Sequence, residues 1–191
     1  AFLEKTGVGE FFIDLSNALA GTRRGGPAKV AVITSALEGT VSGSSVANTV
    51  GSGSFTIPMM KNLGYRPEFA AAVEAAASTG GQIMPPVMGA AAFLMSEIIG
   101  LPYSVIVKAA IIPALLYFAG IYIITDIEAR KQGLKGLSRD QMPSFKRIML
   151  ERGHLILPLV AIIWVLSAGY TPSIAALAGL LCAAVGSYLR T

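Results

Sequence analysis

Apolar residues fall in long stretches that are separated by short polar or basic ones. About 20 such residues in an α-helix cross the ~30 Å hydrocarbon core of a bilayer, because the helix makes its backbone hydrogen bonds internally. The pattern therefore predicts an all-α integral membrane protein. Residues 2–20 instead carry apolar residues at three-to-four spacing, which predicts an amphipathic helix lying along the membrane surface. The apolar stretches occupy residues 28–38, 46–60, 67–100, 105–125, 155–168 and 173–188.

Residues 28–66 have the pattern of a re-entrant helical hairpin. The arms, residues 28–38 and 46–60, would be roughly 17 to 22 Å long, so neither crosses a ~30 Å core alone. Between them lies the polar sequence GTVSGSS at residues 39–45. A hairpin that enters and leaves from one face keeps the basic loops on one side, as the positive-inside rule requires. A single ordinary crossing would place the first and last basic loops on opposite faces.

The same pattern divides the chain into five parts. Residues 1–27 form the amphipathic surface helix and a basic loop, and residues 28–66 form the hairpin. Residues 67–125 combine a broken transmembrane helix with a return helix. Residues 126–153 form a basic cytoplasmic loop, and residues 154–191 form the C-terminal transmembrane helices. The chain begins with alanine and contains each polar motif once, so we expect it to be a piece of a longer polypeptide.

Composition agrees with a membrane location and narrows the partners. The sequence is 53% hydrophobic and 14% charged, with a mean hydropathy of +0.64. The net charge is +4, and the basic residues lie in the short loops between apolar segments, as the positive-inside rule describes. This distribution indicates a membrane protein and not a nucleic-acid-binding protein. Cys182 is the single cysteine, so neither a disulfide framework nor a cysteine metal site is expected.

Two polar sequences at membrane depth are the candidate binding elements. Such backbone is tolerated only where it is buried in protein or lines a wet cavity. Hydroxyl, amide and unwound carbonyl oxygens suit a hard monovalent cation, and free amides at the following helix N-terminus suit a carboxylate. The candidate ion and substrate residues are Ser42, Gly43, Ser44, Ser45, Asn48 and Thr49 at the hairpin tip, and Ser78, Thr79, Gly80 and Gly81 in the broken helix. Among them, Ser44, Asn48, Thr79 and Gly80 are the candidate sodium ligands.

Each polar feature also has a structural interpretation. The two breaks could be kinks packed by small residues. Glu38 and Glu74 lie inside apolar stretches, where a carboxyl group is a candidate for proton coupling. Glu38 could instead cap the hairpin tip, and Glu74 could pair with a basic residue outside this chain.

Other function classes fit the sequence less well. A serine hydrolase would need His154 to reach Ser44, and no nucleophile elbow or zinc-protease signature is present, so we expect no enzyme and no cofactor. A channel would need a repeated filter ring. A non-transporting scaffold or assembly subunit is the main alternative, but it gives no reason to place hydroxyls and an amide at membrane depth.

Three sequences of this chain resemble one known family. SGSSVANTVGSGSFTIPMMKNLGY at residues 42–65, PEFAAAVEAAASTGGQIMPPVM at residues 67–88 and GYTPSIA at residues 169–175 are similar to the large membrane subunit of tripartite ATP-independent periplasmic (TRAP) transporters. Within this family, the three sequences are most similar to those of the fused permeases that work with TAXI-type binding proteins. The resemblance covers nearly the whole chain, and its first two motifs are specific.

The resemblance implies a fold and a function. It implies an elevator-type transporter repeat in the bacterial or archaeal inner membrane, with a helical hairpin and a broken helix. It implies uptake of small organic anions, driven by sodium as the coupling ion and supplied by a periplasmic TAXI-type binding protein. By position, the tip and broken-helix residues named above match the family's first ion-binding region. Only one repeat is present, so we expect the remaining half of the permease to complete the substrate pocket.

Overall fold

The computed structural model describes residues 7–138 and 144–188, and throughout these residues the chain is α-helical without strands. Its helices are α2 (Val8–Ala20), α3 (Gly26–Ser42), α4 (Ser45–Gly51), α5 (Gly53–Leu63), α6 (Pro67–Gly80), α7 (Ala90–Ile99), α8 (Tyr103–Lys131), α9 (Phe145–Arg152), α10 (Leu157–Ser167) and α11 (Pro172–Tyr188). The short 3₁₀ helix η2 (Gly153–Ile156) joins α9 to α10. The all-α class predicted from the apolar pattern is confirmed.

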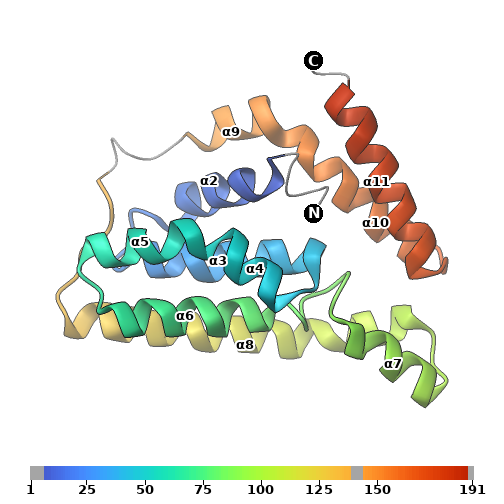
Figure 1. Cartoon of the computed structure of the whole chain (residues 1–191), viewed down its shortest axis with the longest axis horizontal. Helices are drawn as coiled ribbons and strands as arrows, with labels where there is room; N and C mark the ends of the chain where they lie inside the picture. Colours follow the sequence, from blue (N-terminus) through green and yellow to red (C-terminus); the bar gives the residue numbers. More distant parts are fainter. Residues whose placement is uncertain (1–6, 139–143, 189–191) are drawn as a thin grey trace.

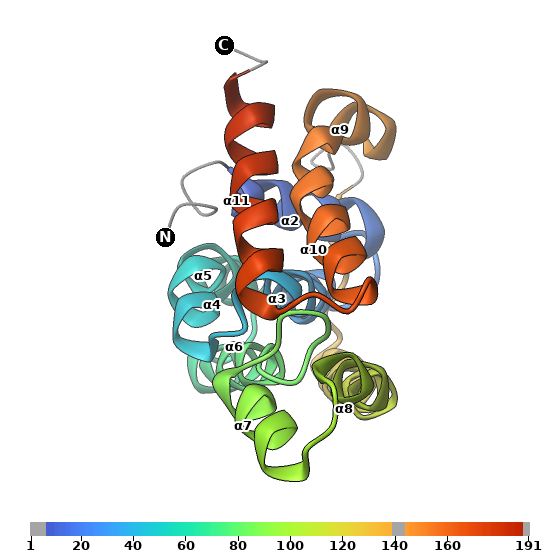
Figure 2. The same cartoon turned by 90° about the vertical axis from the view of Figure 1, so that its right-hand side faces the viewer.

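The N-terminal helix α2 packs against protein. Its amphipathic pattern buries Phe11, Phe12 and Val8, which form one cluster with Ile148 of α9. Figures 1 and 2 show α2 lying between α3 and α9. The predicted surface helix therefore finds its apolar partner in neighbouring helices. Residues 2–6 of that prediction lie outside the described residues.

The hairpin consists of α3 as one arm and of α4 followed by α5 as the other, antiparallel to it (Figure 1). The predicted polar tip at residues 39–45 is shorter in the structure, because α3 continues to Ser42. Gly43 ends α3 with φ of 58°, the left-handed conformation that glycine adopts at little cost, and its N–H bonds to the Gly39 carbonyl. The second arm bends at Ser52, where α4 ends and α5 begins.

The third apolar stretch is a broken helix. α6 ends at Gly80, residues 81–89 form turns that include a cis peptide bond between Pro85 and Pro86, and α7 resumes at Ala90. α8 runs back alongside α6 and α3, as Figure 1 shows. The core between these helices contains Val32, Met60, Val73 and Phe118, together with small alanines that permit close approach.

The predicted cytoplasmic loop, residues 126–153, is helical toward both of its ends. α8 continues through Asp126 and Arg130, which form an (i, i+4) ion pair, and α9 occupies residues 145–152. The apolar stretch from which the helix end was predicted stops at residue 125. α8 continues beyond it, with charged residues that pair along the helix surface. Arg139, one of the basic residues of that loop, lies outside the described residues.

Within the part of the chain that the structure describes, two helical stretches are long and apolar enough to cross a membrane. One is α8, Tyr103–Lys131, and the other is Phe145–Leu166, which runs through α9, η2 and most of α10. α8 leaves a row of large apolar side chains exposed, including Ile112, Leu116 and Ile124. Exposed apolar surface of this extent is typical of a face that contacts lipid. α10 and α11 form a separate antiparallel pair (Figure 2), with Ile162, Val165 and Ala175 at their interface.

Candidate functional site

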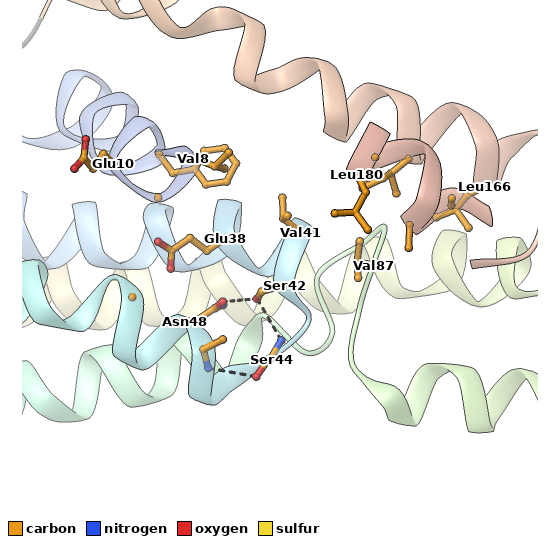
Figure 3. A pocket seen from close by; sticks show the side chains of 18 of the residues that line it. Val8, Glu10, Glu38, Val41, Ser42, Ser44, Asn48, Val87, Leu166 and Leu180 are labelled. Carbon is orange, nitrogen blue, oxygen red and sulfur yellow. Dashed lines mark hydrogen bonds between the residues drawn. The ribbon is translucent and has the colours of Figure 1, made fainter. Parts of the chain in front are cut away.

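The hairpin tip is organised around Asn48. This side chain is 1% exposed, its amide nitrogen donates to the Ser35 carbonyl at 3.4 Å, and its amide oxygen accepts from the Ser42 hydroxyl. The Ser42 hydroxyl also accepts from the Ser44 N–H at 3.2 Å (Figure 3). Because Asn48 belongs to α4 and its partners belong to α3, the amide ties the two arms together immediately behind the tip.

The N-terminus of α4 is already capped. The Ser44 hydroxyl accepts from the Ala47 N–H at 3.3 Å, as an N-cap side chain does. The helix has only seven residues. The anion cradle expected at the start of this arm is therefore partly closed by the protein's own side chain.

Three glycines let the tip contact the break after α6. A Cβ on Gly39 would overlap the Cα of Gly81, and a Cβ on Gly81 would overlap the Asn48 amide nitrogen. A Cβ on Gly43 would overlap the Met88 carbonyl oxygen. The Gln82 amide also donates to the Ser45 hydroxyl at 2.9 Å. The structure thus brings the two predicted binding elements together, with backbone against backbone.

Some predicted site residues face elsewhere. The Thr79 side chain is exposed and its hydroxyl donates to the Ala75 carbonyl of its own helix, while the Thr49 hydroxyl donates to the Ser45 carbonyl. A Cβ on Gly80 would lie 2.6 Å from the ring of Tyr117, so the lack of a side chain at Gly80 allows α6 to pack closely against α8. The structure does not bring Thr79 and Gly80 to the Asn48 cluster, and their role as sodium ligands stays a prediction.

Glu74 is fully buried beneath the tip. Its Oε1 accepts from the hydroxyls of Ser52 at 2.7 Å, Ser78 at 3.1 Å and Ser35 at 3.5 Å, and its Oε2 accepts from Thr56. These hydroxyls come from α3, the α4–α5 bend, α5 and α6. No ion pair of Glu74 occurs among the described residues, where four hydroxyls donate to its carboxyl group. Pairing with a basic residue outside this chain stays a prediction.

Three of these hydroxyl residues were not among the predicted site residues. Ser52 and Thr56 lie four residues apart in an otherwise apolar arm, a spacing that places both on one helical face. That spacing was a usable signal for a shared polar partner. Ser35 gave no comparable signal, because its polar neighbour Thr34 is adjacent in sequence and so does not share a helical face with it.

A cavity of about 820 Å³ lies on the other side of the tip, between α2, the hairpin and the α10–α11 pair. Most of its lining is apolar, including Val41, Val87 and Leu180, as Figure 3 shows. Ser42, Ser44, Asn48 and half-buried Glu38 supply its polar wall. The tip therefore contributes polar atoms to the cavity wall on one side and contacts the break on the other.

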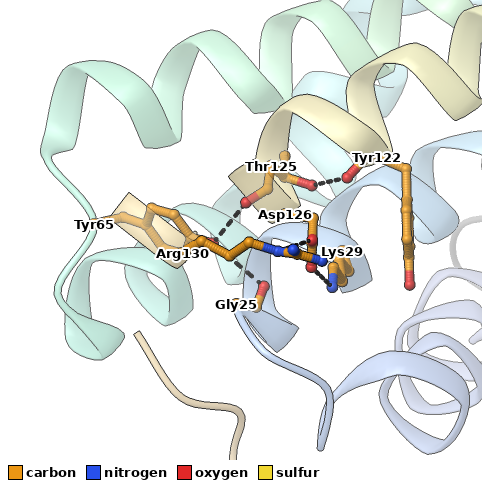
Figure 4. Close-up of polar contacts among 7 residues, drawn as sticks. All are labelled: Gly25, Lys29, Tyr65, Tyr122, Thr125, Asp126 and Arg130. Atoms are coloured by element: carbon orange, nitrogen blue, oxygen red, sulfur yellow. Dashed lines mark hydrogen bonds and ion pairs between the residues drawn. The ribbon is translucent and has the colours of Figure 1, made fainter. Parts of the chain in front are cut away.

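The open end of the hairpin is fixed to α8 by charge. The Lys29 ammonium of α3 lies 2.6 Å from Asp126 Oδ1, and Arg130 Nε lies 2.7 Å from Oδ2 of the same carboxylate (Figure 4). The Lys29 side chain is only 5% exposed, and its Nζ lies 5.1 Å from the centre of the Tyr122 ring. A nearly buried cation with two such partners holds the first arm against the return helix.

Comparison with known proteins gives the family. The family model of the tripartite ATP-independent periplasmic transporter, DctM component, matches residues 1–190. A C4-dicarboxylate TRAP transporter large permease protein, DctM, of Pseudomonas aeruginosa is 29% identical over 178 residues, covering 92% of this chain and 41% of that protein. The protein of the same name in Rhodobacter capsulatus is 30% identical over 188 residues, covering 92% and 43%.

A sialic acid TRAP transporter large permease protein, SiaM, of Vibrio cholerae is 25% identical over 178 residues, covering 91% of this chain and 40% of that protein. The chain thus spans about two fifths of the length of these curated relatives. The match to the family model runs through the hairpin, the broken helix and the C-terminal helix pair without interruption. The chain belongs to the DctM component family, the large membrane subunits of TRAP transporters.

Proposed function

We propose that the chain is part of the membrane permease of a secondary transporter that imports small organic anions together with sodium. The family supports a permease, and the polar cluster at the hairpin tip carries the proposal for this part of it. Asn48, Ser42 and Ser44 place neutral oxygens beside unwound backbone, inside a bundle whose other contacts are mostly apolar. Neutral oxygens of this kind suit a hard monovalent cation.

Substrate class and partners follow from the relatives as proposals. The relatives named above are called transporters of C4-dicarboxylates and of sialic acid, which are organic acids. We propose a periplasmic TAXI-type binding protein as the donor of substrate, the remaining half of the permease as the other wall of the pocket, and the cytoplasmic membrane as the multi-pass location. Alternating access would come from movement of the hairpin unit against a scaffold.

Sodium is proposed over protons because the tip cluster contains no carboxylate of its own. Glu38, at the cavity wall, and Glu74, below the tip, are the two groups through which a proton gradient would act instead. A non-transporting scaffold subunit remains the alternative function. It predicts that changes at the tip affect stability alone.

Asn48→Ala is expected to reduce sodium-driven uptake at least tenfold, because it removes the amide that holds the tip and supplies an oxygen to the cluster. The measurement uses the full-length permease with its binding protein in liposomes under an inward sodium or proton gradient. The transported probe is the radiolabelled carboxylate that most raises the melting temperature of the binding protein.

The matched control is Ser54→Ala. This exposed hydroxyl of α5 donates only to the Gly51 carbonyl and lies outside the tip cluster, so uptake should stay within about twofold of the unmodified permease. Equal uptake by Asn48→Ala and the control under a sodium gradient would refute the site. Uptake driven by protons alone would refute sodium coupling.

A further inference from the structure

Four residues form a closed ring of hydrogen bonds through side-chain and backbone groups: Ser35 of α3, Asn48 of α4, Ser52 between α4 and α5, and Glu74 of α6. Glu74 Oε1 accepts from the Ser52 hydroxyl at 2.7 Å, and the Ser52 backbone N–H donates to the Asn48 backbone carbonyl at 2.9 Å. The Asn48 amide donates to the Ser35 carbonyl at 3.4 Å, and the Ser35 hydroxyl returns to Glu74 Oε1 at 3.5 Å. Asn48 is thereby linked to the broken helix through a buried carboxyl group.

The bend between α4 and α5 is shaped for this carboxyl group. Gly53 follows Ser52 directly, and a Cβ at Gly53 would lie 3.1 Å from Glu74 Cγ, tighter than ordinary carbon contact. Ser52, Gly53 and Thr56 thus present two hydroxyls and a gap to one side chain. Because these residues and Glu74 are buried, their polar atoms depend on one another for hydrogen bonds.

We propose that Glu74 is a positioning residue that sets the orientation of Asn48, and that it acts as a hydrogen-bond acceptor. It does not reach the tip cluster itself, because Ser52 and Ser35 stand between them. This inference rests on the proposed role of Asn48 in sodium-coupled transport and deepens it. Three of the four hydroxyls donate to Oε1, and two of these, from Ser52 and Ser35, belong to the ring. An amide oxygen in the place of Oε1 can therefore accept the same hydrogen bonds.

The test compares three variants of the full-length permease. Glu74→Leu keeps approximate volume but removes the acceptors, and the sodium concentration for half-maximal uptake should rise at least tenfold. Glu74→Gln retains one carbonyl oxygen and should stay within about threefold of the unmodified permease. Ser52→Ala breaks one link of the ring with a small change and should raise the half-saturating sodium concentration about threefold to tenfold.

Thr34→Val is the matched control. Thr34 is fully buried in α3, next to Ser35 in sequence, and it takes no part in the ring, so its half-saturating sodium concentration should stay within about twofold. If Glu74→Leu does not fold, the comparison of Ser52→Ala with Glu74→Gln still tests whether Glu74 acts on Asn48 through the ring. A half-saturating sodium concentration raised as much by Glu74→Gln as by Glu74→Leu would overturn the acceptor role. A half-saturating sodium concentration that Ser52→Ala leaves unchanged would overturn the ring.

A second readout does not depend on transport. In a full-length background in which Cys182 and any cysteine outside this chain are replaced by serine, a cysteine at position 44 (Ser44→Cys) reports on the tip through its rate of labelling by a maleimide. Glu74→Leu should raise that rate severalfold, and Glu74→Gln should not. An equal rate in all variants would overturn the positioning role. Absence of sodium-driven uptake by the unmodified permease would instead refute the proposed function, while the labelling rates would still decide the role of Glu74.

Discussion

Gly39→Ala is expected to abolish sodium-driven uptake, because it separates the hairpin from the broken helix. A Cβ at Gly39 would overlap the Cα of Gly81, which is backbone and cannot rotate away as a side chain can. Overpacking of this kind costs about 1–3 kcal/mol and shifts the surrounding backbone. Asn48 packs against the same side of Gly81 as Gly39 does, so a displacement of Gly81 would disturb the tip cluster as well. Uptake in liposomes and melting of the purified permease give the two readouts.

Gly120→Ala is the control for that prediction. Gly120 lies in α8, and nothing approaches within 4 Å of a Cβ built there. Alanine favours the helix over glycine by up to about 1 kcal/mol, so this variant should melt at the same temperature or higher and transport normally. Normal uptake by Gly39→Ala would mean that the contact between hairpin and break is unimportant for transport.

Asp126→Asn is expected to lower the melting temperature of the full-length permease by on the order of 10 °C. The substitution leaves the Lys29 ammonium nearly buried without its carboxylate, and breaking such a pair by removing one partner is strongly destabilising. The face of the Tyr122 ring and a neutral amide oxygen at position 126 would remain beside the ammonium, and neither carries a compensating charge. Lys29→Met should cost less, since Asp126 keeps its pair with Arg130.

The double variant Lys29→Met/Asp126→Asn separates charge from packing. It removes both charges of the pair, so that no ammonium remains buried without its carboxylate. We expect it to melt well above Asp126→Asn alone, as a double-mutant cycle would measure. A double variant no more stable than Asp126→Asn would show that the pair contributes through shape and not through charge.

Helix type could be predicted from the apolar pattern, whereas helix number and helix ends could not. The second hairpin arm is divided into α4 and α5, and α9 lies in the predicted loop. α8 runs six residues beyond the predicted stretch because Asp126 and Arg130 pair along its surface, and such pairing is invisible to hydropathy. α3 runs on to Ser42 because the helix ends where Gly43 adopts a left-handed conformation. Periodicity reports burial, while local geometry decides where a helix stops.

The candidate site was predictable as a region but not residue by residue. Both polar sequences were identified, and the structure brings Ser42, Asn48 and Gly81 together. Thr79 has the right chemistry for an oxygen ligand, yet its hydroxyl returns to its own helix at Ala75. Orientation around a helix axis near a break depends on packing with α8 and the hairpin, and a single sequence does not contain that information.

Glu74 illustrates the same limit from the other side. Its position in an apolar stretch predicted either a proton-coupling group or the partner of a base outside this chain, and both stay predictions. The structure supplies four hydroxyl donors from segments up to 39 residues distant, a solution that spacing along one helix could not suggest. Buried polar groups find hydrogen-bond partners, but the fold decides which ones.

Substrate-dependent entry of radioactive sodium into liposomes tests the central claim most directly. The liposomes contain the full-length permease, and binding protein is added with or without its carboxylate ligand. The proposed mechanism predicts sodium entry that begins with addition of loaded binding protein and is lost, together with substrate uptake, in Asn48→Ala. Accumulation of substrate without any accompanying sodium entry would contradict it.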